Sequence, residues 1–197
     1  KMKRLLIILT VLPIAVLGQN VEQKAAQLTD YLNRSIGDID SIKFQRLFFD
    51  AFPSSFVDFN AMFGWTTDAG TKEIKYGPLY DGHKEVDLFF RLQIVPDETF
   101  YKKMIEIWNG GQWNADAINY FQQGLRRKVF NNPTLSFRLL SKLTDQEIER
   151  LFVFFFDGPH PQYKVIPKEL ESMKSYDARI YRLMDNGLSQ VLAKGDH

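Results

Sequence analysis

The sequence predicts an all-α protein, a single-domain irregular array of about seven or eight helices packed orthogonally. Three observations lead to this fold class. Apolar residues recur at spacings of three and four along most of the chain, as on one face of a helix. Pro53, Pro96 and Pro133 divide that pattern into short helices, which suit an orthogonal array better than a long four-helix bundle. The segment Gly64–Gly82 departs from the pattern and is expected to be one long irregular loop.

Residues 1–18 are expected to be a signal peptide. Three of the first four residues are basic, and the uncharged run Leu5–Leu17 follows them, which is the order found in secretory signals. The run is too short for a membrane span, which needs about 20 apolar residues. We expect cleavage after Gly18 to leave residues 19–197 as a single helical domain without a stable membrane span, in the periplasm or secreted.

Composition argues against some classes of function. The chain has 25 Lys and Arg against 24 Asp and Glu. Residues 1–18 hold three of the basic residues and none of the acids, so their removal leaves 22 against 24, a net charge of −2. That balance offers no electrostatic footprint for nucleic acid, which is not an expected partner. The absence of cysteine excludes disulfides and a thiolate nucleophile.

Apolar stripes predict the helices before the loop. The first covers Val21–Asn33, with one apolar residue on each turn at Val21, Ala25, Leu28 and Leu32. The second begins at Asp40 or Ser41, either of which can cap it, and ends at Pro53. The residues expected to point inward from it are Ile42, Leu47, Phe48 and Ala51. Pro53 suits the first turn of a third helix, whose apolar residues are Phe56, Val57, Phe59 and Phe63.

The loop Gly64–Gly82 has the composition of turns. Its turn-forming residues are Gly64, Thr66, Thr67, Asp68, Gly70, Gly77, Pro78 and Gly82. A long irregular connection inside a compact domain is uncommon and is often functional. This loop is therefore where we expect function to lie.

Helical pattern returns after the loop. The expected segments are Glu85–Gln93, Pro96–Trp108, Asn114–Val129 and Pro133–Leu143. Pro96 is a strong start because proline and the acids that follow it both suit a first turn.

The C-terminal third is expected to hold the centre of the core. Thr144–Glu147 has the S/T-x-x-E form of a capping box, which marks a helix start. The run Leu151–Phe156 is apolar all round, which indicates a central helix with Phe152 and Phe155 buried on one side. A strand is the alternative for so short a run, and the capping box favours the helix. The last helix is expected at about Tyr176–Ala193.

Metal chemistry is the alternative to a non-catalytic role, and the sequence leaves open whether the chain is an enzyme. The chain has no Gly-x-Ser-x-Gly, Ser-x-x-Lys or phosphate-binding loop motif, and no cofactor is expected. If two loops meet, His83, Asp87, Asp157 and His160 could form a zinc site with two nitrogen and two oxygen ligands. The simpler interpretation places His160 at the end of its helix, where a cation is favourable, and makes Asp157 an anchor of the turn.

Aromatic residues supply the candidate binding surface. They lie in the loop and beside the glycine pair at 110–111, at Trp65, Tyr76, Tyr80, Trp108 and Trp113. Tyrosine and tryptophan are common anchors of protein recognition. The alternative is that these residues cover the helical core.

These observations favour an exported, non-catalytic protein that binds another protein. Its concrete form is an inhibitor of the immunity type, which blocks a toxin delivered into the periplasm. A metal-dependent hydrolase or metal-binding protein is the alternative.

Overall fold

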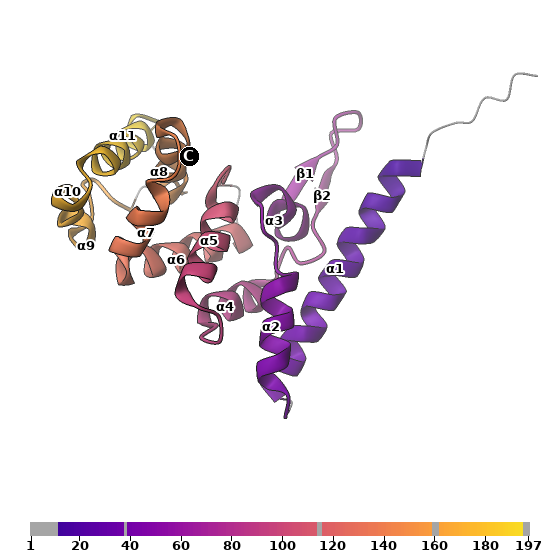
Figure 1. Cartoon of the computed structure of the whole chain (residues 1–197). Helices are drawn as coiled ribbons and strands as arrows, with labels where there is room; N and C mark the ends of the chain where they lie inside the picture. Colours follow the sequence, from indigo (N-terminus) through magenta and orange to yellow (C-terminus); the bar gives the residue numbers. More distant parts are fainter. Residues whose placement is uncertain (1–11, 38, 114–115, 159–161, 195–197) are drawn as a thin grey trace, which may run out of the picture.

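The computed structural model describes residues 12–37, 39–113, 116–158 and 162–194. Helices dominate this part of the chain, and one small sheet accompanies them (Figure 1). The helices are α1 (Leu12–Gly37), α2 (Ser41–Ala51), α3 (Phe56–Phe63), α4 (His83–Arg91), α5 (Asp97–Trp108), α6 (Asp116–Asn131), α7 (Pro133–Leu140), α8 (Asp145–Phe156), α9 (Lys168–Glu171), α10 (Met173–Tyr176) and α11 (Ala178–Lys194). The strands are β1 (Trp65–Thr67) and β2 (Ile74–Tyr76).

The predicted helical class is confirmed, and the predicted number of helices is wrong. The described residues contain ten helices instead of seven or eight when α9 and α10, which are separated by Ser172 alone, count as one. Each of these two segments has four residues. A single turn is too short to show an apolar period, so the sequence pattern gave no sign of them.

The segment Gly64–Gly82 is not irregular throughout, which corrects the prediction. Within it β1 and β2 pair antiparallel, with Trp65 opposite Tyr76 and Thr67 opposite Ile74. Asp68 shapes the turn between them, because its Oδ1 accepts hydrogen bonds from the backbone N–H groups of Gly70 and Thr71, each at 2.9 Å. Strands of three residues are too short to reveal alternation in a sequence.

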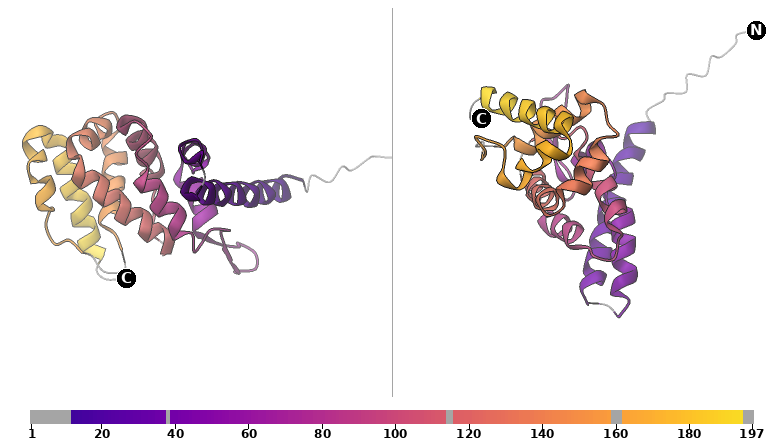
Figure 2. Two further views of the ribbon diagram at one scale, coloured as in Figure 1. Left: turned by 90° about the horizontal axis from the view of Figure 1, so that it is seen from below. Right: turned by 60° about the vertical axis from the view of Figure 1, so that its left-hand side comes forward.

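The helices form an elongated array (Figures 1 and 2). At one end α1 and α2 lie side by side as an antiparallel pair. At the other end α11 packs along α8, next to the short helices α9 and α10. Between these pairs α4 packs against α6, while α5 contacts α3 and α7. The hairpin of β1 and β2 projects beside α3 and α1.

One cluster of apolar side chains runs through the described helices and is rich in phenylalanine. The rings of Phe52 and Phe89 stack with centroids 4.2 Å apart, and Phe59 lies 4.9 Å from Phe121. Phe152 and Phe155 are both fully buried, as predicted. The core therefore joins helices from both ends of the array.

One residue predicted to face inward is exposed instead. Ile42 of α2 faces solvent, as does Val57, one of the apolar residues of α3. The buried face of α2 consists of Phe44, Phe48 and Phe49, which lie within one helical stripe that excludes Ile42. An isolated apolar residue on a surface is ordinary and does not define the buried face of a helix.

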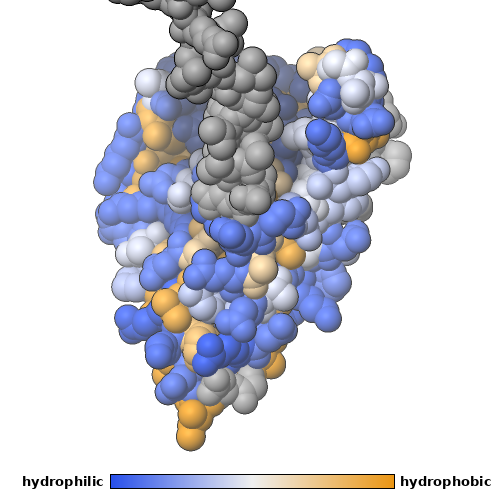
Figure 3. Space-filling view, turned by 90° about the vertical axis from the view of Figure 1, so that its right-hand side faces the viewer, coloured by the Kyte–Doolittle hydropathy of each residue, from blue (hydrophilic) through white to orange (hydrophobic). Residues whose placement is uncertain are grey.

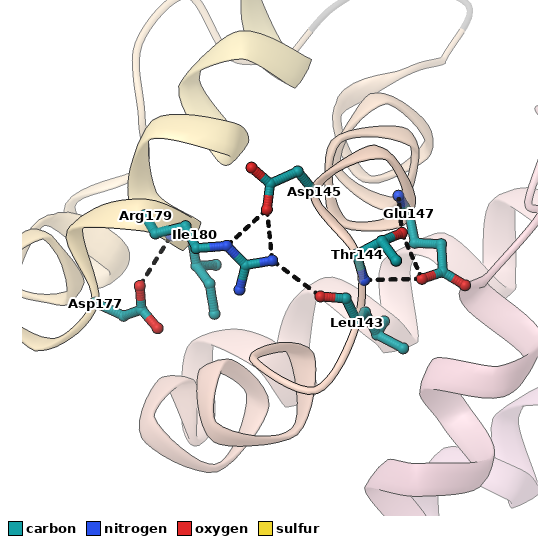
Figure 4. A network of polar contacts seen from close by, with 7 residues as sticks. All are labelled: Leu143, Thr144, Asp145, Glu147, Asp177, Arg179 and Ile180. Carbon is teal, nitrogen blue, oxygen red and sulfur yellow. Dashed lines mark hydrogen bonds and ion pairs between the residues drawn. The ribbon is translucent and has the colours of Figure 1, made fainter.

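Polar contacts fix the start of α8 and join it to α11 (Figure 4). The capping box is confirmed: Thr144 Oγ1 accepts from Glu147 N at 3.3 Å, and Glu147 Oε2 accepts from Thr144 N at 2.9 Å. Arg179 of α11 donates from Nε to Asp145 Oδ1 at 2.6 Å and from a terminal nitrogen to the carbonyl oxygen of Leu143 at 2.9 Å. These contacts hold the first turn of α11 beside the first turn of α8.

Helix α1 includes the bond after Gly18 at which cleavage is predicted. Residues 1–11 lie outside the described part of the chain, and the signal peptide stays a prediction. Within the described residues, none of the helices combines the length and the apolar character needed to cross a bilayer.

Candidate functional site

Two hollows beside the hairpin are the candidate functional site. The tyrosine pocket has a volume of about 630 Å³, and its principal lining residues are Thr29, Tyr76, Pro78, Tyr80, Asp81 and Glu85. The tryptophan pocket has a volume of about 620 Å³, and its principal lining residues are Asn60, Trp65, Thr67, Gln112, Trp113 and Asp157. The predicted aromatic surface is thus divided between two hollows.

Backbone contacts fix the chain where it leaves β2 for the tyrosine pocket. The N–H of Gly77 donates to the carbonyl of Gly64 at 2.8 Å, and that of Leu79 donates to the carbonyl of Met62 at 2.9 Å. A Cβ atom at position 77 would lie 2.4 Å from the carbonyl oxygen of Met62, so the approach of the two backbones requires glycine there. The segment is thereby held against the end of α3.

This anchored segment brings Tyr76 and Tyr80 together. Their ring centroids lie 4.6 Å apart with the planes inclined at 60°, an edge-to-face arrangement. Tyr76 is 60% exposed, while Tyr80 is half-buried. The pair gives the pocket one aromatic wall that solvent can reach.

A buried carboxylate forms another part of the wall. Glu85 is the third residue of α4 and is only 6% exposed. Its Oε1 accepts a hydrogen bond of 2.9 Å from the hydroxyl of Thr29, which lies on α1. Among the described residues, no second donor or basic side chain contacts the carboxylate. Since an ionised carboxylate has acceptor sites on both oxygens, Glu85 can still bind a donor.

The charged side chains that line the tyrosine pocket are Asp81 and Glu85, both acidic. No lysine, arginine or histidine is among the described residues that line it. The N-terminal end of α4 adds a partial positive charge of about half an elementary charge. Two full negative charges outweigh that contribution, so the pocket favours cations.

The tryptophan pocket differs in chemistry. Trp65 and Trp113 are both half-buried in its wall. Asp157 follows α8, and its carbonyl oxygen accepts hydrogen bonds from Gln122 at 3.3 Å and Arg126 at 3.0 Å. Part of this wall is therefore fixed by contacts that hold the end of α8.

Trp108 does not belong to a binding surface, which corrects the prediction. Its side chain is fully buried, and its ring lies 5.5 Å from that of Phe152 at 90°. The indole Nε1 donates to the carbonyl oxygen of Leu151 at 2.5 Å. Trp108 packs α5 against α8, since its apolar ring is buried there and its one N–H donor has a hydrogen-bond partner.

The residues of the alternative metal site have other contacts. His83 is exposed at the start of α4, with Nδ1 3.1 Å from the carbonyl oxygen of Asp81. Asp87 lies 4.0 Å from Arg91 one turn further along α4, and Asp157 Oδ1 accepts from Gly158 N at 3.0 Å. His160 lies outside the described residues, and the four-residue site stays a prediction.

No group of three or more potential metal ligands comes together in the described part of the chain.

Sequence reasoning missed Thr29 and Glu85. Thr29 lies four residues after Ala25 and three before Leu32, so it belongs to the apolar stripe of α1. Glu85 lies four residues before Phe89, on the buried face of α4. A polar residue on an apolar stripe is the signal that could have identified both, since buried polar groups need partners.

Comparison with known proteins gives no family: no family model, curated protein or solved structure matches this chain.

Proposed function

We propose that this chain is a non-catalytic binding protein that recognises another protein through its hairpin and the tyrosine pocket. The observation that carries the proposal is the exposure of large apolar groups on the projecting sheet. Ile74 is 53% exposed and Tyr76 is 60% exposed, both on β2. Tyrosine at the mouth of a hollow is a common anchor of protein interfaces.

The hairpin offers a partner a surface that the helical core does not need. The side chains of β2 are exposed, and β2 pairs with no described strand other than β1. The backbone contacts of Gly77 and Leu79 hold the base of the hairpin, so the surface is ordered before binding. An ordered surface loses less conformational entropy when a partner docks.

The concrete form that we favour is an exported inhibitor of the immunity type, acting against a toxin in the periplasm. The basic and then apolar order of residues 1–18 supports export. An inhibitor needs a rigid recognition surface and no reactive group of its own, which fits the held hairpin.

Photo-crosslinking tests the proposal directly. A photoreactive phenylalanine analogue is placed at position 74 on the hairpin or at position 165. Val165 is a matched control because it is apolar and 74% exposed, but lies beside α11. We expect one envelope protein to crosslink from position 74 and not from position 165.

Binding of that protein, once purified, completes the test. The double variant Ile74→Ser, Tyr76→Ala should weaken its affinity at least about tenfold, as loss of an interface anchor does. Val165→Ser should leave the affinity unchanged. Equal crosslinking from both positions, or equal affinity of both variants, would show that the hairpin is not the recognition surface.

A further inference from the structure

We infer that the tyrosine pocket receives a basic side chain, lysine or arginine, from the partner protein. The inference rests on the proposed function and adds the chemistry of the partner. It follows from the charge of the pocket, the half-satisfied carboxylate of Glu85, the aromatic wall and the shape of the hollow.

The carboxylate of Glu85 favours a positively charged ligand. A buried ion is costly unless it is paired and hydrogen-bonded. At 6% exposure Glu85 has one described donor, the hydroxyl of Thr29. A hydroxyl supplies a hydrogen bond but no compensating charge. An ammonium or guanidinium group in the pocket would supply both.

None of the described basic side chains of this chain pairs with Glu85. No described lysine or arginine lies within ion-pair distance of Glu85. Lys75 of β2 lies 3.5 Å from Asp68, in the turn of the hairpin and away from the pocket. A cation for Glu85 therefore comes from outside the described chain.

The aromatic wall also favours a basic side chain. A cation over the face of a tyrosine ring is attracted by the electrons of the ring, and more strongly when water is excluded. Tyr76 and Tyr80 meet edge to face, and Tyr76 is 60% exposed, so a group that enters the pocket can reach its ring. Both line the same hollow as Glu85 and Asp81. Aromatic rings beside carboxylates suit the long apolar stem and charged end of lysine or arginine.

The shape of the hollow favours a side chain presented by a docked protein over a free small molecule, which binds there more weakly. The pocket is open to solvent, and its lining includes the last residue of β2 and the segment that follows it. Small-molecule sites bury about 70–90% of the ligand surface, which an open hollow does not do. A protein surface that docks on the hairpin would instead cover the pocket and exclude water from the ion pair.

The test uses the full mature protein and a defined probe. Nα-acetylarginine methylamide is titrated while amide resonances are followed by NMR, and the citrulline counterpart, which is equal in shape but uncharged, is the control. We expect saturable shifts at Tyr80, Gly82 and Glu85 with the arginine probe alone. Equal shifts with the citrulline probe, or the absence of saturable shifts at these positions, would overturn the inference.

Two variants separate charge from folding. Glu85→Gln keeps the size of the side chain and removes its charge, and should weaken probe binding at least about tenfold. Asp81→Asn alters an exposed acid of the same pocket and should weaken it less, with no effect on folding. Asp87→Asn is the matched control on α4, since Asp87 pairs with Arg91 and does not line the pocket. Unchanged binding by both pocket variants would exclude the site.

The crosslinked partner distinguishes this inference from the proposed function. If the partner binds Glu85→Gln and the parent protein equally, the hairpin interface stands and the cation pocket is wrong. If the free arginine probe binds through Glu85 while no protein crosslinks to the hairpin, the proposed function is wrong, and the pocket binds small cations instead of a side chain of a partner. Two results together support both the proposed function and the cation pocket. The partner binds Glu85→Gln more weakly than the parent protein, and the citrulline probe causes no saturable shifts at the pocket.

Discussion

At the scale of single residues, polar side chains on α6 hold the C-terminal end of α8. Arg126 is buried and donates from Nε to the carbonyl of Phe155 at 2.8 Å and from a terminal nitrogen to that of Asp157 at 3.0 Å. Gln122, also buried, donates to the carbonyl of Phe154 at 2.5 Å. The last carbonyls of a helix lack partners within the helix, so α6 supplies donors that α8 needs.

Removal of the Arg126 side chain should therefore be costly. Arg126→Met keeps much of the apolar stem but leaves the carbonyls of Phe155 and Asp157 without these donors. We expect a loss of about 2–4 kcal/mol in the free energy of unfolding, measured by urea denaturation. Arg127→Met, at the exposed neighbouring position, should change it by less than about 0.5 kcal/mol. Equal effects would mean that the contacts of Arg126 add nothing to stability.

Lys103 gives the protein a distinct response to alkaline pH. Its Nζ donates to the carbonyl of Phe49 and, at 3.4 Å, to that of Asp50, at the end of α2. Burial lowers the pKa of Lys103 to about 8, although Asp50 and Glu106 oppose the shift. The unfolded chain keeps this proton up to about pH 10.5, so it binds more protons than the folded chain between pH 8 and 10.5.

The free energy of unfolding should consequently rise as pH increases from about 8 to 10. Above pH 10 Tyr101 opposes the rise, because burial raises the pKa of its phenol to about 12 while the unfolded chain ionises near 10. Urea titrations across pH 7–11 would measure both effects. Lys103→Met should remove most of the rise and leave the smaller part that comes from Lys128, whose pKa is also lowered by burial. Lys102→Met, on the exposed neighbour, should retain the whole rise. A rise of unchanged size in Lys103→Met would assign it to another group.

At the scale of elements, α8 is the centre of the C-terminal half. Phe152 and Phe155 are fully buried, and Phe155 lies 5.6 Å from the ring of Trp108. Phe152→Ala or Phe155→Ala should each lower the free energy of unfolding by about 3–5 kcal/mol. Val153→Ala on the half-buried side of α8 is the control and should cost less. A loss below about 1 kcal/mol at either phenylalanine would place α8 at the periphery.

The contact between α8 and α11 depends on one glycine. Gly187 lies inside α11, where alanine would ordinarily favour the helix by about 0.8–1 kcal/mol. A Cβ at this position would lie 2.8 Å from Phe152 Cβ and 3.0 Å from the backbone N of Val153. Because rigid atoms form this contact, the two helices would have to separate.

Gly187→Ala should thus lower the melting temperature in spite of its gain in helix propensity. Ser189→Ala, on the exposed face of the same helix, should leave it unchanged or raise it slightly. Thermal unfolding followed by circular dichroism measures both variants. A Gly187→Ala protein as stable as Ser189→Ala would show that α8 and α11 are less closely packed than described.

At the scale of the whole molecule, the continuous apolar cluster predicts cooperative unfolding. The cluster contains residues from α1 through α11, including Leu28 and Val191. We expect far-ultraviolet circular dichroism and tryptophan fluorescence to give coincident urea transitions, which also tests the prediction of a single domain. The fluorescence should respond to Trp108 in the core. Two separated transitions would indicate that the ends of the array unfold independently.

The whole molecule also exposes apolar surface at the end of its α1–α2 pair. Ile36, Ile39 and Ile42 flank the turn between these helices and are all exposed. Figure 3 shows hydrophobic surface at this tip. The tip adds nothing to the core, so the helical pattern of α1 and α2 rests on their other faces.

Features that depend on residues close together in the chain could be predicted from the sequence. The helix that follows Pro96 and the capping box of Thr144 and Glu147 depend on residues within one turn, and both are present. The stripe at Ala25, Leu28 and Leu32 is buried as its spacing predicted. Strands β1 and β2 were not predicted, because each has only three residues and depends on the other for its hydrogen bonds.

The sequence by itself determined that this chain is helical, where several helices begin, and which phenylalanines fill the core. Tertiary structure alone decided that Trp108 is interior while Tyr76 and Tyr80 share a pocket, and that Thr29 meets Glu85. The reason is distance along the chain. Helix starts and apolar stripes arise from neighbours three or four residues apart. The contact between Thr29 and Glu85 joins residues 56 positions apart, and only the packing of α1 against α4 brings them together.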